Sequence, residues 1–297
     1  MNRKIIRQGY EGCTFSLPIE WIRQNKLKPG DELDVTCHGK DILVRCKSSS
    51  QAKTKEIFLK RKDSFPMLRS IVSSLYKAGY DEILVHLAEN IPLRRLHELT
   101  NSFTGLEIVS LSGNLIKIKS LLKEDDADME NTVIKMFQTI NYMIECLVSK
   151  WNKISISDMQ AVADSMIRMR DYALRSIHTL APDKYKKYDF CDLVTQLERM
   201  SAQMVYISKY VSERNPKDNS WIHKFKKEYE WLYHCYLKKD FSTSVTFWEN
   251  NRLYVARAFK PSALEKLSKT YGGLAIHYYA LMMRLRQLAS RTVALSI

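Results

Sequence analysis

From Asp125 onward the apolar residues recur at three- and four-residue steps, and this spacing continues almost to the end of the 297-residue chain. Such spacing gathers apolar side chains on one face of an amphipathic helix. We expect six helices with short connections, an antiparallel bundle or two three-helix bundles. Their apolar positions span 129–151, 156–177, 190–211, 221–237, 241–259 and 261–293.

The first fifty residues have a different pattern, in which short β-favouring segments are separated by turn residues. We expect strands at 3–10, 13–17, 32–37 and 41–46, with a short helix from Pro18 to about Leu27 between the second and the third. A unit this small buries too little apolar surface to be stable alone. It should therefore form a dimer or pack against a neighbour.

A polar linker at 47–53 precedes a segment whose pattern predicts strands and helices in the order β-α-β-α-β-β. This segment contains neither a GxGxxG nor a GxxxxGK[ST] motif, so nucleotide binding has no support in the sequence. We expect no enzyme activity, and packing or spacing is the default role of this segment. The predicted fold class is multidomain α+β, with domains at 1–47, 54–122 and 125–297.

Charge is the composition feature that bears most directly on function. The chain has 47 Lys and Arg against 33 Asp and Glu, a formal net charge of +14. This excess favours a polyanionic partner, with nucleic acid ahead of an anionic membrane surface. No apolar stretch approaches the roughly 18 residues of a membrane span, and no signal peptide is evident. We expect a cytoplasmic protein without membrane insertion, whose six cysteines, with no CxxC pair, are reduced thiols.

Two short motifs in the first domain carry a family resemblance. Leu17-Pro18 and Leu27-Lys28-Pro29-Gly30-Asp31 resemble the swapped-hairpin domain of the AbrB, MazE and SpoVT family. The resemblance implies an intertwined homodimer, built as a small β-barrel, whose basic face binds double-stranded DNA. The candidate DNA-binding residues are Arg3, Lys4, Arg7, Arg23, Lys26 and Lys28. Ile19 and Glu20 follow Pro18, where relatives often have a basic residue, so we expect modest affinity.

A helical bundle behind such a domain resembles the archaeal regulators with a PhoU-like C-terminal part. Residues 75–83 and 114–120 are also similar to the middle region of that family. The resemblance implies a regulator of phosphate uptake or phosphate signalling that contacts a transport or signalling protein through the bundle. Some members hold metal clusters with [ED]xxxD motifs.

Glu124 and Asp128 have the spacing of that acidic motif. They lie at a predicted helix start, where the helix dipole favours acids whatever their function. Asp164, Asp171, Asp192 and Glu198 have no second carboxylate four residues away. We therefore expect no metal and no cofactor, with Glu124 and Asp128 as weak candidates only.

Residues 221–254 combine many aromatic side chains with lysines, a composition that also occurs on surfaces that stack nucleic-acid bases. The aromatic residues fall at helical steps and on more than one face, which favours a bundle core plus a protein interface.

Three functions are compatible with these patterns. The first is a homodimeric DNA-binding transcriptional regulator with a helical sensory or interaction part. The second is a phosphate-signalling adaptor that acts through protein contacts and whose first domain only dimerises. The third is an antitoxin, which the folded helical half argues against because antitoxin tails are usually disordered until bound.

Overall fold

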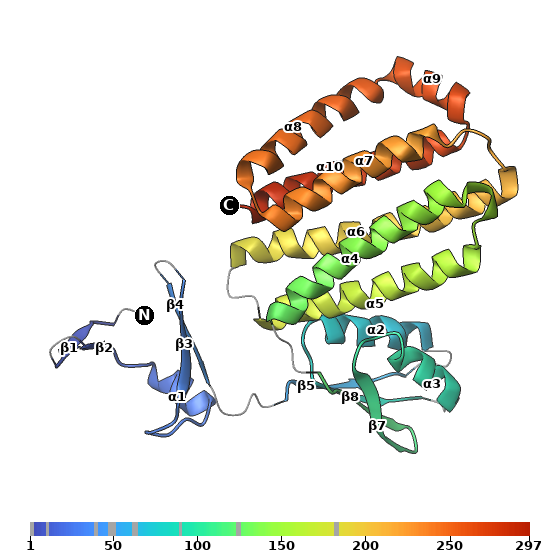
Figure 1. Ribbon diagram of the computed structural model, residues 1–297. Helices are drawn as coiled ribbons and strands as arrows, with labels where there is room; N and C mark the ends of the chain where they lie inside the picture. Colours follow the sequence, from blue (N-terminus) through green and yellow to red (C-terminus); the bar gives the residue numbers. More distant parts are fainter. Residues whose placement is uncertain are drawn as a thin grey trace. The chain divides into compact units, whose positions relative to one another are not determined.

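The computed structural model describes residues 3–9, 12–38, 41–46, 52–60, 65–88, 91–122, 126–180 and 184–297. Contacts between Cα atoms divide the chain into two compact units, Met1–Lys53 and Thr54–Ile297. The boundary falls at the end of the predicted linker. The predicted segments 54–122 and 125–297 belong to the same compact unit. The molecule is mixed α+β with small sheets and a helical C-terminal region (Figure 1).

The first unit contains two antiparallel hairpins with a short helix between them in the chain. Its elements are β1 (Ile6–Gln8), β2 (Gly12–Thr14), α1 (Ile19–Gln24), β3 (Leu33–His38) and β4 (Asp41–Cys46). Strand β1 pairs with β2 and β3 pairs with β4, in two separate two-stranded sheets. The predicted order is confirmed, but the first two strands are shorter than the expected 3–10 and 13–17. Gly9, with a φ of 70°, turns the chain directly after β1.

The second unit begins with a four-stranded sheet that has two helices. Its elements are β5 (Thr54–Phe58), α2 (Phe65–Lys77), β6 (Glu82–His86), α3 (Leu93–Thr100), β7 (Leu106–Ser112) and β8 (Leu115–Ser120). The strand order is β5-β6-β8-β7, parallel between β5 and β6 and antiparallel elsewhere. Alternate residues of β6 and β8, such as Ile83, Val85, Ile116 and Ile118, are buried in one core with α2 and α3.

The helical region has seven α-helices within the described residues, not the six expected. They are α4 (Asp126–Ser149), α5 (Ile156–Leu180), α6 (Lys184–Arg214), α7 (Ser220–Lys238), α8 (Phe241–Ala258), α9 (Pro261–Tyr271) and α10 (Leu274–Leu295). The expected helix over 261–293 is two helices because Gly272 and Gly273 interrupt it. Gly272 has a φ of 56°, and a Cβ on Gly273 would lie 2.7 Å from a ring carbon of Tyr210. A residue with a side chain would fit neither position well.

A continuous core joins these helices, with α6 packed against α5, α4 and α10, and α10 packed in turn against α7 and α8. The core includes the buried aromatic residues Phe137, Trp221, Phe225 and Tyr229. The hydroxyl of Tyr229 donates to the carbonyl oxygen of Phe137 at 2.8 Å, which satisfies a buried polar group. No described helix is both long enough and apolar enough to cross a membrane.

Arg175 of α5 connects the bundle to the α/β segment. Its side chain is fully buried and donates to the carbonyl oxygens of Tyr76 and Tyr80, at 3.2 and 2.6 Å, and to the Oδ1 atom of Asp81 at 2.8 Å. The guanidinium also lies 5.2 Å from the centre of the Tyr76 ring. Figure 1 shows the resulting contact of α2 with α5. One side chain therefore holds the end of α2 against the bundle.

Glu228 of α7 is a half-buried acid with no hydrogen bond or ion pair in the described part of the chain. Burial raises the pKa of its carboxyl group. The pKa of Glu228 is higher in the folded state than in the unfolded state, so the folded state favours the protonated carboxyl group. As the pH rises from the unfolded pKa through the folded pKa, this group therefore lowers the stability of the fold. Glu228→Gln should therefore unfold at a higher temperature than the parent at about pH 7, and at the same temperature near about pH 3. An equal or lower midpoint at neutral pH in thermal melts followed by circular dichroism would contradict this.

Candidate nucleic-acid interface

The first group of candidate DNA-binding residues lies at the start of the chain. Arg7 is on β1, opposite Cys13 of β2. Arg3 and Lys4 precede β1, which corrects the expectation that all three lie on the first strand. β1 begins only at Ile6, because its partner strand β2 ends at Thr14, the residue paired with Ile6. All three basic side chains are exposed.

The second group, Arg23, Lys26 and Lys28, surrounds the end of α1. Arg23 is in the last turn of the helix, and Lys26 adopts a left-handed backbone conformation with a φ of 54°. The backbone N–H of Lys28 donates to the Oδ2 atom of Asp31 at 2.7 Å, which stabilises the turn that follows. All three basic side chains are exposed, and no ion pair engages them within the described residues. A turn at residues 28–31, in which the backbone N–H of Asp31 donates to the carbonyl oxygen of Lys28 at 3.1 Å, thus follows the helix end that carries these cations.

The first basic group lies on and before β1, and the second lies around the end of α1. Glu20, in the first turn of α1, is exposed near the second group, and Ile19 beside it is also exposed. A single chain thus presents two groups of exposed cations, with the acids Glu20 and Asp31 near the second. Phosphate oxygens could contact each of them directly, because neither requires a buried charge to be uncovered.

Apolar residues of the first unit remain uncovered in the single chain. None of the side chains described between residues 3 and 46 is buried. In the β3–β4 register one face consists only of apolar side chains, namely Leu33, Val35, Cys37, Ile42, Val44 and Cys46. Val35 is 59% exposed and Ile42 is 57% exposed. A two-stranded sheet with one open apolar face is marginally stable in water, so this face requires a cover.

The acidic residues of the bundle that the structure describes do not assemble into a metal site. Asp128 is exposed on α4, and Glu124 lies outside the described residues. No group of three or more His, Cys, Asp or Glu side chains in the described ranges is arranged to hold a metal ion.

Several acids that are isolated in the sequence are paired with arginines from another helix or from a neighbouring position. Arg170 bonds to Asp171 at 2.7 Å and to Glu198 at 2.9 Å. Burial alone would lower the pKa of the Arg170 guanidinium. The carboxylates of Asp171 and Glu198 have the larger combined effect and raise this pKa. Arg291 bonds to Asp189 and Asp192 in the same way. Helical spacing does not reveal the Arg170–Glu198 pair or the two pairs of Arg291, because α5 meets α6 and α6 meets α10 only in the folded bundle.

The aromatic stretch forms the core of the bundle, as its spacing predicts. Trp221, Phe225, Tyr229, Tyr236 and Phe247 are buried. These five rings therefore cannot stack on nucleic-acid bases, whereas Phe241 and Tyr254 of the same stretch are exposed. The basic residues of the first unit remain the candidate interface.

Known proteins add nothing to this geometry. The chain matches no model of a protein family, no curated protein and no solved structure. The candidate interface therefore depends on the residues of this chain alone.

Proposed function

We propose that this protein is a DNA-binding transcriptional regulator that acts as a homodimer. In this proposal the first units of two copies associate, and their basic residues together bind the phosphates of double-stranded DNA. The helical region contacts an effector or a partner protein. No catalytic step is part of the proposed function.

The observation that carries the proposal is the open apolar face of the β3–β4 hairpin. This face carries six apolar side chains, and no described side chain of the unit is buried. To be excluded from water, the face must contact another apolar surface of about the same area. A second copy supplies an identical face, as two-fold association requires. The resemblance to swapped-hairpin domains favours the same assembly.

Charge then favours DNA as the ligand of the dimer. Dimerisation doubles the number of exposed cations, and two symmetric basic surfaces suit the repeated phosphates of a duplex. Arg23, Lys26 and Lys28 surround one helix end, where their ammonium and guanidinium groups are not neutralised by described carboxylates. Nearby Glu20 repels phosphate and keeps the affinity moderate.

Val35→Glu tests the proposal in the full chain. A carboxylate on the apolar face should prevent its burial, because a buried unpaired charge costs several kcal/mol. We expect the parent to sediment as a dimer and to bind DNA from its own upstream region. The variant should sediment as a monomer and lose most of this binding.

Ile276→Glu is the matched control for Val35→Glu. Ile276 is an even more exposed apolar residue, at 72%, but it lies on α10 in the second unit. The control should keep the mass and the DNA affinity of the parent. A Val35→Glu protein that remains a dimer would contradict the proposed interface. A dimer that binds no DNA at any salt concentration would favour the adaptor function instead.

Phosphate uptake is the process that we propose for this regulator, on the resemblance of the helical region alone. The described residues hold no carboxylate cluster for a metal-assisted phosphate site. A link to phosphate would therefore run through contacts with a transport or signalling protein. Such a link predicts that the protein binds DNA upstream of phosphate-transport genes in preference to unrelated DNA.

A further inference from the structure

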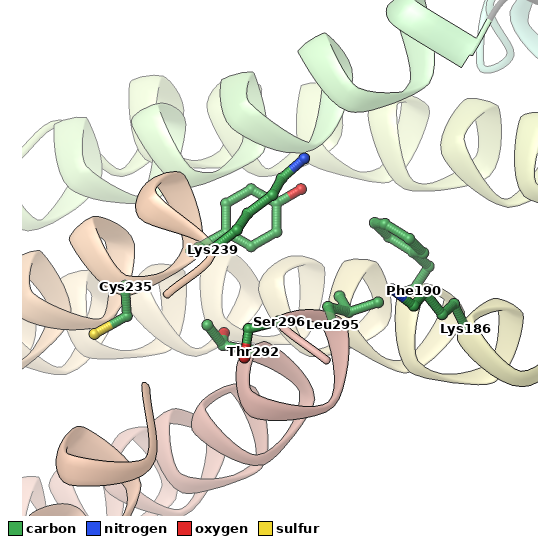
Figure 2. Close-up of a pocket in the computed structure, with 8 residues that line it drawn as sticks. Lys186, Phe190, Cys235, Lys239, Thr292, Leu295 and Ser296 are labelled. Carbon is green, nitrogen blue, oxygen red and sulfur yellow. The ribbon is translucent and has the colours of Figure 1, made fainter. Parts of the chain in front are cut away.

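A pocket of about 180 Å³ lies inside one end of the helical region. It is lined by residues from the first turns of α6, the last turns of α7 and the last turn of α10 (Figure 2). These elements are far apart in the sequence and meet only through packing of α6 and α7 against α10. The candidate DNA-binding residues belong to the other unit, so this pocket is a separate feature.

Two lysines give the pocket a positive charge. Lys239 is the residue that caps α7, in a left-handed conformation with a φ of 50°, and its ammonium group forms an ion pair with Glu130 of α4. Lys186 of α6 is half-buried, and its ammonium group has no hydrogen bond or ion pair in the parts of the chain that the structure describes. Among the described residues Glu130 balances only one of the two lysines, so the described lining retains one positive charge.

The remaining lining favours an apolar group beside that charge. Phe190 and Leu295 contribute a ring and a branched alkyl group to the walls. The hydroxyl of Thr292 donates to the carbonyl oxygen of Leu288 at 3.0 Å, and the hydroxyl of Ser296 donates to that of Val293 at 2.8 Å. Both hydroxyl protons are therefore used at the end of α10, and the donors left for a ligand are the two lysine ammonium groups and the hydroxyl of Tyr236.

These features distinguish between two kinds of anion. Inorganic phosphate carries more charge than a carboxylate, and it has no apolar group to lie against the Phe190 and Leu295 walls. A carboxylate attached to an apolar group needs one cation for its charge and an apolar wall for the attached group. The pocket is large enough for such a ligand, since a cavity of about 150 Å³ lined by apolar side chains holds a benzene ring.

We propose that this pocket binds a small organic monocarboxylate with one ring-sized apolar group. The carboxylate pairs with Lys186, and the apolar group lies against Phe190 and Leu295. Such a ligand would connect α6, α7 and α10, so its binding stabilises the helical region. The proposal concerns an effector of the protein and does not depend on DNA binding.

Benzoate is the probe for this site, and benzamide is its neutral analogue of the same shape. In calorimetric titrations of the full chain we expect benzoate to bind at least tenfold more tightly than benzamide and to raise the melting temperature. Lys186→Met should remove this preference for the anion. Ser296→Leu should fill the pocket and abolish the binding of both compounds. Lys266→Met, which removes an exposed lysine of α9, is the matched control and should bind benzoate like the parent.

Three results would overturn the proposal. Benzoate and benzamide could bind equally, the preference for benzoate could persist in folded Lys186→Met, or inorganic phosphate could bind this pocket in place of benzoate. Circular dichroism establishes whether each variant is folded. Lys186→Met and Ser296→Leu alter different ends of the chain's helices, so if one of them fails to fold, the other still tests the proposal. None of these readouts measures DNA binding, so the pocket and the proposed DNA function can fail independently.

Discussion

Arg175→Met should lower the free energy of unfolding of the full chain by about 3 kcal/mol, because a charged donor with several hydrogen bonds is lost. The methionine fills much of the space but cannot donate to the carbonyl oxygens of Tyr76 and Tyr80 or to the carboxylate of Asp81. Buried acceptors without a donor are costly. The loss should be concentrated where α2 meets α5.

Urea denaturation measures this change, and hydrogen exchange locates it. We expect amide protection to fall in α2 and β6 before it falls in the α6–α10 part of the core. Arg94→Met is the matched control, because Arg94 is a 90% exposed arginine on α3 in an ion pair with Glu98. An exposed pair of this kind contributes about 0.3–0.5 kcal/mol. Equal destabilisation by the two substitutions would show that Arg175 does not hold the segments together.

The second large effect concerns DNA binding by a protein in which Lys4 and Arg23 are both replaced by alanine. These residues represent the two basic groups of the first unit, and neither has an ion pair among the described residues. In a dimer the double substitution removes four contacts if each side chain meets one phosphate. Each contact contributes about −0.9 to the log–log salt slope on duplex DNA. The slope should therefore flatten by about 3.6, with a loss of about three orders of magnitude in affinity near 0.1 M salt.

Fluorescence anisotropy across a salt series measures both the slope and the affinity. Lys224→Ala combined with Lys227→Ala is the control, because it removes two exposed lysines from α7 and changes the net charge equally. We expect the control to bind almost as the parent does. If the control loses as much affinity as the double variant, the DNA-binding face is not on the first unit.

Local patterns predicted much of the secondary structure. Strand β4 has the expected bounds, since its β-favouring residues lie between clear turn residues. Helix α8 begins as expected at Phe241, where the carboxylate of Asp240 accepts the backbone N–H of Thr243 at 2.7 Å. The start of α6 was not evident, because residues 184–189 carry polar side chains that do not continue the apolar spacing.

Tertiary structure decided how distant segments use their polar residues. Arg175 has no partner that its neighbours in the sequence predict, yet it binds residues about 95 positions earlier in the chain. The same holds for Arg291 and its two aspartates on α6, and for the pocket that Lys186 and Lys239 line together. Helical and strand periods in the sequence show which face of a single element is apolar. An ion pair or a pocket forms between elements, so it depends on which elements pack against each other.

The candidate DNA-binding residues are an intermediate case. The sequence by itself determined their identity and exposure, because charged side chains next to short turns and strands remain in water. The structure placed Arg3 and Lys4 before β1 instead of on it, and it showed that one face of β3–β4 is wholly apolar, with Val35, Cys37 and Ile42 exposed. The pairing register decides which side chains share a face, and register is a property of two strands together. The need for a partner at this face therefore became visible only in the folded chain.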